Sequence, residues 1–372
     1  MTSAPAKPLR AGIIGTGGIA QSHARAMTTL EGEIDLVAVT DLDRDRAAAF
    51  AAEHGDPTVF LNAQELLESA ELDLVSICTP PQTHAPLAIT AMRAGITALV
   101  EKPTALSLAE VDEIAEVETE TGVQTLTVFQ HRFGVAARRL GELVDSGALG
   151  RPLVATCDTL WFRPDSYFDV PWRGRWDIEG GGPTMGHGIH QFDLLLSVLG
   201  DWQEITAVAA RQLRPTDTED VSAALVRMQS GAVVTVMNSL LSPRETSRVR
   251  FDFERATVEV EHLYGYQSSD WIFTPAPGHE ELAEQWNPAE DGTSGHRHQL
   301  AAIAQALTAG ERAGVDLAEA RRTLEFAAAT YASAFRRTPI TAGQIAGDDP
   351  FMTSMSGGMV PWEQTKNQAV TS

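Results

Sequence analysis

A glycine-rich turn between an apolar strand and a helix most constrains how this chain can fold. The apolar residues 9–14 predict a strand that runs directly into Gly15-Thr16-Gly17-Gly18-Ile19-Ala20. In this G-x-G-x-x-A pattern, Gly15 permits a tight turn, Gly17 lets a pyrophosphate approach the backbone, and Ala20 lets the next helix pack closely. The helix expected over residues 17–29 would point its free N–H groups at the phosphates. The turn therefore predicts a dinucleotide-binding fold.

An acidic residue after the second expected strand bears on which dinucleotide is bound. Residues 36–40 predict a strand that ends at Asp41, 21 residues beyond the glycine motif. A carboxylate here can accept hydrogen bonds from the ribose hydroxyls and repels a 2′-phosphate, which favours NAD over NADP. Arg44 lies close enough to weaken this preference for NAD over NADP. Alternatively, Asp41 caps the helix expected over residues 43–53, and the two roles can be shared with Asp43.

Two further loops follow apolar strands, at the sheet edge where ligands of such folds bind. The first follows residues 73–78 and reads Thr79-Pro80-Pro81-Gln82-Thr83-His84; its prolines end the strand and shape a rigid loop. The second closes the buried run 96–100 and reads Glu101-Lys102-Pro103. A lysine here is costly to desolvate, so it usually has a charged partner, a ligand or a chemical task. The alternative is a lysine that extends its ammonium to water at the rim.

The order of strands and helices predicts two domains and a tail. Strand and helix signals alternate through six units up to residue 129, which predicts an α/β domain with a doubly wound parallel Rossmann sheet. Beyond it, short turns join long strands, which predicts an α+β domain with a large, mostly antiparallel open sheet. We therefore expect a dinucleotide-binding domain (1–129), a substrate-binding and oligomerisation domain (130–346) and a C-terminal arm or tail (347–372).

Two strands of the second domain predict a subunit interface. The strands expected over residues 221–228 and 233–240 are largely apolar on both alternating faces, and the turn Gln229-Ser230-Gly231 joins them. Helices on one face of such a sheet leave the other face exposed unless a second subunit covers it. The sequence therefore predicts a homo-oligomer, either a dimer or a tetramer.

Composition excludes several classes of partner. The 372 residues carry a net charge of −22, which argues against binding to nucleic acid or to an anionic membrane. The two cysteines, Cys78 and Cys157, predict reduced core residues rather than a disulfide framework. Residues 1–8 lack the apolar segment of a signal peptide, and no apolar stretch approaches the length of a membrane span. We therefore expect a cytoplasmic protein.

A second segment with catalytic side chains follows a flexible glycine run. The sequence Gly180-Gly181-Gly182 leads into a helix that carries Gly186, His187 and His190 on one face, with Asp193 one turn beyond His190. Histidine is well suited to moving a proton near neutral pH, and Asp193 could orient the His190 ring. The alternative roles are a polar residue at a helix end or a hydrogen-bonded core residue.

Taken together, these motifs resemble the glucose–fructose oxidoreductase, inositol dehydrogenase and MocA-type (Gfo/Idh/MocA) family of NAD(P)-dependent oxidoreductases. The resemblance covers about residues 8–345 and depends on the order and spacing of five motifs: Gly15-x-Gly17-x-x-Ala20, Thr79-Pro80-Pro81-x-x-His84, Glu101-Lys102-Pro103, Gln130-His131-Arg132-Phe133 and Gly180-Gly181-Gly182…His190-x-x-Asp193. It implies a Rossmann domain, a second domain whose open sheet makes the subunit interface, and oxidation or reduction of a sugar or cyclitol carbinol.

The resemblance also implies roles for individual residues. Lys102 would lie near the reacting hydroxyl, with His190 as the helix histidine of the site. Many members have an aspartate four residues before that histidine, where this chain has Gly186, so His187 is the candidate replacement in the proton relay. The expected cofactor contacts are the turn residues and the two loops: Gly15, Thr16, Gly17, Gly18, Ile19, Asp41, Thr79, Pro80, His84, Glu101 and Lys102. No metal is expected.

Aromatic and arginine residues before the glycine run are candidate substrate contacts. Residues 161–176 include three tryptophans, one tyrosine and three arginines. Aromatic faces pack against sugar C–H groups, and arginines bind hydroxyls or carboxylates. We expect Tyr167 and Arg173 to contact the substrate together with Lys102, His187 and His190; packing that holds the loop in place is the alternative.

Three other functions remain open at this point. The chain could keep NAD bound and cleave a glycosidic bond through transient oxidation, as some relatives do. It could be a non-catalytic protein that senses a dinucleotide, although a sensor has no need of Lys102 and His190. A metal site could form from His187, His190 and Asp193, or from His296 and His298. His187, His190 and Asp193 are spaced i, i+3 and i+6, so they are spread around the helix rather than lying on one face. This spacing argues against a metal site formed by these three residues.

Overall fold

The computed structural model describes residues 7–287 and 292–364, which form two compact units. The first unit contains the residues up to 105 together with residues 109–128 and 296–320; the second contains residues 106–108, 129–295 and 321 onward. Each unit has its own sheet, with six strands in the first and eight in the second. None of the helices within the described residues combines the length and apolar character that a membrane crossing needs.

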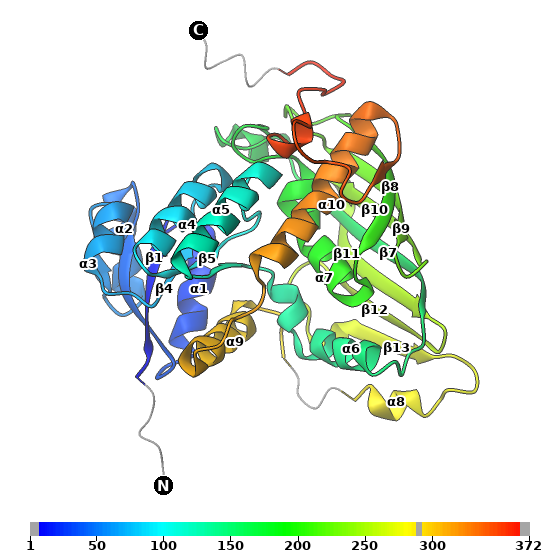
Figure 1. The fold of residues 1–372 in the computed structure, drawn as a ribbon, viewed down its shortest axis with the longest axis horizontal. Helices are drawn as coiled ribbons and strands as arrows, with labels where there is room; N and C mark the ends of the chain where they lie inside the picture. The colour runs from blue at the N-terminus through cyan, green and yellow to red at the C-terminus, as the bar shows by residue number, and fades with distance from the viewer. Residues whose placement is uncertain (1–6, 288–291, 365–372) are drawn as a thin grey trace. The chain divides into compact units, whose positions relative to one another are not determined.

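The first unit is built on a parallel sheet with the strand order β3-β2-β1-β4-β5-β6 (Figure 1). Its strands are β1 (Leu9–Ile14), β2 (Ile34–Thr40), β3 (Thr58–Val59), β4 (Leu74–Ile77), β5 (Thr97–Val100) and β6 (Thr125–Thr127). β4 and β5 are buried along their whole length, as expected for parallel strands covered on both faces. The order reverses between β1 and β4, and ligands of open α/β sheets bind at the carboxyl ends of strands beside such a point. The doubly wound sheet predicted from the sequence is confirmed.

Helices of the first unit come from both ends of the chain. They are α1 (Gly18–Thr28), α2 (Arg44–Glu53), α3 (Ala63–Ser69), α4 (His84–Arg93), α5 (Leu108–Thr121) and α9 (His296–Ala309). The sequence-based division placed all of residues 130–346 in the second domain, whereas residues 296–320 belong to the first unit. The reason is apolar packing: Leu300 and Ile303 of α9 are buried in one core with Ala24 and Met27 of α1.

The second unit contains an open sheet with the order β13-β12-β11-β7-β10-β9-β8-β14. Its strands are β7 (Pro152–Phe162), β8 (Trp202–Ala210), β9 (Val221–Met228), β10 (Val233–Ser239), β11 (Leu241–Phe253), β12 (Ala256–His262), β13 (Trp271–Pro275) and β14 (Ile340–Thr341). β10 pairs with β7 in parallel, and the other neighbours pair antiparallel. The mostly antiparallel sheet is confirmed, although the sequence did not predict β13 and β14.

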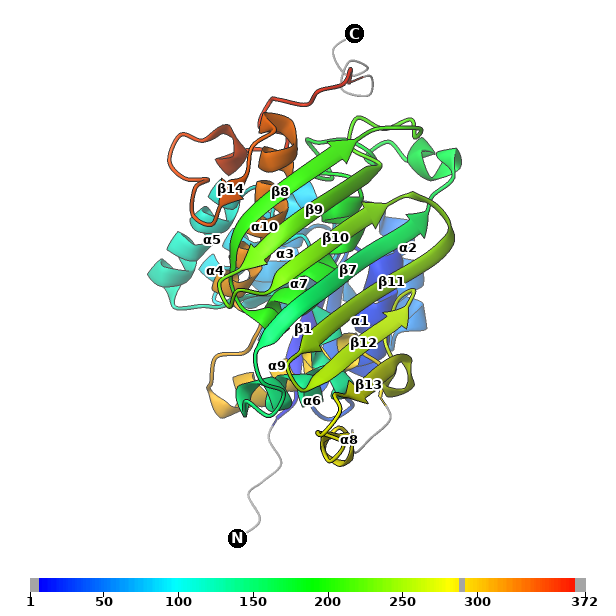
Figure 2. The same ribbon diagram turned by 90° about the vertical axis from the view of Figure 1, so that its right-hand side faces the viewer.

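Helices of the second unit cover one face of this sheet. They are α6 (Val135–Asp145), α7 (Ile189–Leu199), α8 (Leu282–Gln285) and α10 (Leu317–Arg336), the last of which starts in the first unit. Figure 2 shows the sheet from its other face, with α7 and α10 behind it. Side chains of β9 and β10 alternate between buried and more exposed positions, as strand geometry requires. One face of the sheet is therefore core, and the other is solvent-facing.

Part of the expected C-terminal tail packs against the second unit. Phe351 and Met355 are buried, and Asp349 pairs with Arg336 of α10 at 2.6 Å. Trp362 donates a hydrogen bond from Nε1 to the carbonyl of Asp217 at 2.8 Å. Within the predicted arm or tail, residues 347–364 are thus held by two buried apolar side chains and an ion pair. Residues 365–372 lie outside the described part of the chain.

Candidate active site

The glycine turn between β1 and α1 has the geometry of a phosphate-binding site. Gly15 has a φ of +88°, and a Cβ here would lie 2.9 Å from the carbonyl oxygen of Cys78, so only glycine fits. A Cβ at Gly17 or Gly18 would meet no atom within 4 Å, which leaves the backbone open to an approaching ligand. The first turn of α1 contains no acidic residue and receives no side-chain cap. Its N–H groups and positive dipole end therefore fit a pyrophosphate.

Asp41 at the end of β2 is tied to both the glycine turn and α2. Its Oδ2 accepts hydrogen bonds from the Thr16 backbone N–H at 2.7 Å and from the Thr16 hydroxyl at 3.0 Å. Arg46 donates from Nη2 to Oδ1 at 2.5 Å and from Nε to Oδ2 at 3.2 Å. Partial burial acts to raise the pKa of Asp41, but these bonds, led by that of Arg46, lower it to about 2. The carboxylate is thus charged at the end of β2, and its contact with a ribose stays a prediction.

The neighbours of Asp41 answer two questions that the sequence left open. Asp43, rather than Asp41, caps α2 by accepting from the backbone N–H of Arg46. The arginine paired with Asp41 is Arg46, whereas the sequence suggested Arg44 as the residue that softens its effect. A spacing of five residues across a helix start gives no clear sequence signal, so Arg46 was missed. The remaining predicted turn residues, Gly18 and Ile19, open α1 beside the buried Ala20.

Glu101 lies in a buried cluster of the first unit that the sequence did not predict. Its Oε1 is 2.9 Å from Nε2 of His23 on α1 and 3.3 Å from Nε2 of His296 on α9. The other ring nitrogen of His23 is 3.1 Å from the hydroxyl of Ser76. Burial acts to raise the pKa of Glu101, but the two histidine hydrogen bonds bring it well below its usual value. A buried carboxylate therefore stays charged directly before Lys102.

The same three side chains are of the types that hold metals, with ligand atoms within 4.8 Å of one another. Both imidazoles already point at one oxygen of Glu101, so hydrogen bonds alone account for the cluster. The sequence raised two other sets of possible metal ligands, His187 with His190 and Asp193, and His296 with His298. Of these residues, His296 alone belongs to the cluster found among the described residues. Direct contact of Glu101 with a cofactor stays a prediction.

His84 joins the two loops at the carboxyl edge of the first sheet. Its Nδ1 is 2.7 Å from the carbonyl oxygen of Pro103, and its Nε2 is 2.8 Å from that of Thr79. Burial lowers the pKa of this histidine. The ring therefore holds the loop after β4 against the loop that contains Lys102. Cofactor contacts by Thr79, Pro80 and His84 themselves stay predictions.

In the second unit, the glycine run opens directly into the predicted histidine helix. Thr184–Gly188 form one π-helical turn, a form often found at functional sites, and α7 continues from Ile189. His187 and His190 are both buried, with exposed fractions of 8% and 3%. The His187 ring lies 4.8 Å from that of Trp161, whereas the His190 ring lies 5.1 Å from that of His131 and 5.5 Å from that of Tyr264. The two histidines thus have different aromatic neighbours.

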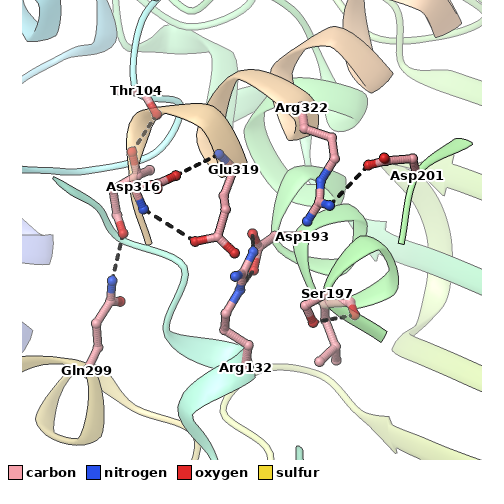
Figure 3. Close-up of polar contacts among 11 residues, drawn as sticks. Thr104, Arg132, Asp193, Ser197, Asp201, Gln299, Asp316, Glu319 and Arg322 are labelled. Carbon is pink, nitrogen blue, oxygen red and sulfur yellow. Dashed lines mark hydrogen bonds and ion pairs between the residues drawn. The ribbon is translucent and has the colours of Figure 1, made fainter. Parts of the chain in front are cut away.

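Asp193, which the sequence suggested as an orienting partner of His190, makes a buried ion pair. Nε of Arg132 donates to its Oδ2 at 2.8 Å, and Nη2 donates to Oδ1 (Figure 3). Removing one partner of a buried pair typically costs about 3–5 kcal/mol, so this bidentate contact anchors α7 to the segment after β6. Orientation of the His190 ring by Asp193 stays a prediction.

Tyr167 and Arg173, the predicted substrate contacts, lie against each other in the second unit, and contact with a substrate stays a prediction. The guanidinium of Arg173 lies 4.0 Å from the Tyr167 ring centre and donates to the tyrosine hydroxyl. It also pairs with Glu179 at 3.3 Å, and the other oxygen of Glu179 accepts from the Gly174 backbone N–H at 2.7 Å. The Tyr167 ring lies 6.3 Å from that of His187. An aromatic face, a hydroxyl and a balanced pair of charges therefore lie near His187.

Several residues that shape these sites were not singled out from the sequence. Trp161, Tyr264 and His131 surround the two histidine rings, and Glu179 balances the charge of Arg173. The only available signal was the aromatic content of residues 161–176 and the Gln130-His131-Arg132-Phe133 motif. Lys102 belongs to the first unit and His190 to the second. Their predicted meeting at one reacting group stays a prediction.

Comparison with known proteins places both units in one family. Residues 9–130 match the model described as "Oxidoreductase family, NAD-binding Rossmann fold", and residues 137–259 match "GFO/IDH/MocA C-terminal domain". Together the two matches cover about two thirds of the chain.

Individual relatives agree with these matches. The D-glucoside 3-dehydrogenase of Escherichia coli (strain K12) is 31% identical over 59% of this chain and 61% of its own length. Inositol 2-dehydrogenase 3 of Saccharopolyspora erythraea is 32% identical over 61% of this chain and 65% of its own length. The chain thus aligns with somewhat less than two thirds of these two relatives.

A solved structure shows the same fold over nearly the whole chain. The WlbA dehydrogenase of Bordetella pertussis, in complex with NADH and UDP-GlcNAcA, superposes with a TM-score of 0.81 at 24% identity. The match covers 90% of this chain and 99% of that one. The two family models match in the expected order, and each lies over the unit that has the corresponding fold. This chain therefore belongs to the Gfo/Idh/MocA oxidoreductase family, with an NAD-binding Rossmann domain at residues 9–130.

Proposed function

We propose that this protein is an NAD(P)-dependent dehydrogenase that transfers hydride between the nicotinamide and a carbinol or ketone of a sugar, sugar derivative or cyclitol. The observation that carries the proposal is the position of Lys102. It follows β5 at the carboxyl edge of the parallel sheet, the same edge at which the glycine turn follows β1. A lysine at the edge where the dinucleotide binds is suited to act on a hydroxyl beside the nicotinamide.

The chemistry of hydride transfer assigns a role to each group in the proposed site. The bound nicotinamide supplies the hydride acceptor or donor. Lys102 takes the hydroxyl proton as the carbinol is oxidised, and His190, with His187 as the candidate replacement for the family aspartate, takes part in the proton relay. The charged Glu101 carboxylate, fixed by His23 and His296, keeps the backbone before Lys102 in place.

The substrate class is supported by the contacts of Arg173. Its charge is balanced by Glu179, and its guanidinium covers the Tyr167 ring, so the loop offers hydrogen-bond donors without a net positive charge. This environment suits an uncharged polyol better than a phosphate or carboxylate, which would require uncompensated arginine. The names of the relatives, a glucoside dehydrogenase and an inositol dehydrogenase, agree with this class.

The proposal is tested by incubating the protein with NAD or NADP and a panel of hexoses, pentoses, glycosides and inositols. We expect net formation of reduced cofactor with at least one uncharged polyol. Release of an aglycone from a glycoside without net NADH would favour transient-oxidation chemistry instead. Tight cofactor binding with no turnover across the panel would favour a dinucleotide sensor.

The Asp41–Arg46 pair predicts how cofactor choice can be changed. The wild-type protein should bind NAD more tightly than NADP, because the charged Asp41 carboxylate repels a 2′-phosphate. Asp41→Ala should reduce the difference between NAD and NADP affinity, since it removes the repulsion and frees Arg46 to pair with the 2′-phosphate. Adding Arg46→Ala should reverse most of the increase in NADP affinity. Fluorescence titration of both cofactors measures these affinities, and tighter NADP binding by the wild type would contradict the assignment.

We infer that the exposed face of the second sheet forms a homo-oligomer interface. Val208 of β8, Leu225 of β9 and Val233 of β10 are 67%, 54% and 44% exposed, and Met237 lies on the same face. A contiguous apolar surface of this kind is typical of subunit interfaces.

The buried free thiols of Cys78 and Cys157 also suit a reducing compartment, which supports a cytoplasmic location.

Light scattering at micromolar concentration should therefore report a dimer or larger assembly. The double variant Val208→Asp/Leu225→Asp should shift it towards a monomer, because each charge would be buried in the interface. Leu61→Asp is the matched control, because Leu61 is 65% exposed in the first unit. A monomeric wild type would rule out the interface.

A further inference from the structure

Glu219 is a fully buried carboxylate that the proposed reaction does not use directly. It lies in the loop between β8 and β9, two residues before β9, and its exposed fraction is 0%. Burying an ionisable group is costly unless its partners compensate for the lost water. Its partners therefore show what it is for.

Those partners lie on the glycine run and on α10. Oε2 of Glu219 accepts from the Gly182 backbone N–H at 3.0 Å, and Oε1 accepts from the Thr184 backbone N–H at 3.1 Å. The hydroxyl of Tyr331 on α10 donates to the same Oε1 at 2.8 Å. Gly182 and Thr184 flank the start of the helical segment that carries His187 and His190. The carboxylate thus occupies the position of a helix N-cap, supplied from a distant part of the chain.

Close packing explains why this run consists of glycines. A Cβ at Gly182 would lie 1.9 Å from the carbonyl oxygen of Glu219, and one at Gly181 would lie 2.2 Å from the Tyr331 hydroxyl. The backbone can therefore reach the carboxylate and the tyrosine only without side chains. The run, which the sequence suggested as a flexible loop, is held against two buried side chains.

We propose that Glu219 is a positioning residue whose buried carboxylate, together with Tyr331, fixes the start of the helix that carries His187 and His190. This inference rests on the proposed function, since it assigns those histidines to the reaction. Glu219 itself acts through backbone N–H groups. When the carboxylate is ionised, both oxygens accept and all three donors are satisfied. When it is protonated, one oxygen becomes a donor, and the set of three bonds cannot persist unchanged.

The ionisation of Glu219 falls in a working pH range. Burial raises its pKa to about 7, although the bonds from Thr184, Gly182 and Tyr331 act to lower it. Tyr331 is the titratable group among the described residues that hydrogen-bond to the carboxylate, and its own pKa is raised well above normal by burial, so its hydroxyl stays neutral. The bonds from Gly182 and Thr184 lower the pKa of Glu219, so they are stronger to the charged carboxylate than to the protonated one. While Glu219 stays buried, its contact with the glycine run therefore weakens as the carboxyl group is protonated below about pH 7. Tyr331→Phe removes a bond that favours the charged form, so the pKa of Glu219 should rise further.

Tyr331→Phe and Glu219→Gln test the inference, with Ser333→Ala as the matched control. Ser333 also lies on α10 and is buried, but its hydroxyl bonds to the Ala207 N–H and the Thr338 carbonyl, away from the glycine run. We expect Glu219→Gln to lower kcat about 10²-fold with little change in NAD affinity, because small displacements of catalytic groups have effects of this size. Tyr331→Phe should shift the acid limb of kcat to higher pH, and Ser333→Ala should not.

Amide hydrogen exchange of residues 180–190, corrected for intrinsic pH dependence, gives a readout that does not need turnover. Protection should fall in Tyr331→Phe relative to Ser333→Ala when both variants are measured at the same pH. If no substrate turns over but protection behaves in this way, the proposed function fails and the positioning role stands. The inference is overturned if Tyr331→Phe matches Ser333→Ala in protection and in the pH dependence of kcat. Tyr331→Phe is nearly isosteric, so the test holds even if Glu219→Gln does not fold.

Discussion

Lys102→Ala is expected to lower kcat by about 10²–10⁴-fold, the usual contribution of general acid–base catalysis. NAD affinity should change little, because the lysine acts mainly on the hydroxyl proton in the transition state and not on the bound dinucleotide. Steady-state kinetics with a substrate from the polyol panel, together with cofactor titration, measure both quantities. A loss confined to KM would instead identify Lys102 as a residue that binds substrate and transition state equally.

Lys102→Arg separates charge from proton transfer at the same position. Arginine keeps the positive charge but does not lose its proton near neutral pH, so this variant should be nearly as slow as Lys102→Ala. Recovery of most of the activity in Lys102→Arg would show that charge alone is needed. Wild-type rates for Lys102→Ala across the pH range would refute the mechanism.

His190→Ala is expected to lower kcat by at least about 10²-fold, and His187→Ala by a comparable factor. The reason is that the family resemblance implies an aspartate where this chain has Gly186, and His187 is the adjacent titratable side chain. The pH dependence of kcat in each variant measures the effect. His187→Asn should be as slow as His187→Ala, because asparagine can hydrogen-bond but does not titrate in this range.

His279→Ala is the control for the histidine variants. His279 lies in the second unit with a side chain that is 38% exposed, and it should behave as wild type. Near-normal rates in His187→Ala would leave His187 as a residue that packs on Trp161 at the helix start. The proton path would then consist of Lys102 and His190 alone.

Local signals explain why much of the fold was predictable. The turn at Gly15, the prolines after β4 and the apolar runs of β4 and β5 each specify their own structure within a few residues. The histidine helix was predictable for the same reason, because His187 and His190 follow a glycine run on one segment.

What the sequence missed depends on contacts between distant residues. Glu101 and His296 are 195 positions apart, and Glu219 and Tyr331 are 112 apart. Nothing in a local pattern pairs them. The same holds for α9, which follows β13 of the second sheet in sequence but packs on α1 of the first unit. Its apolar stripe alone does not show which unit it belongs to. The role of Glu219 in holding the glycine run appeared only when its partners were known.

The most direct test of the central claim uses a substrate that carries deuterium at the carbon to be oxidised. The account predicts one released NADH, with deuterium at C4 of the nicotinamide, for each ketone formed, and a slower rate than with the unlabelled substrate. The same measurement on Lys102→Ala should give the same label at a greatly reduced rate. Consumption of substrate with no net NADH, or with the deuterium returned to the product, would contradict the account.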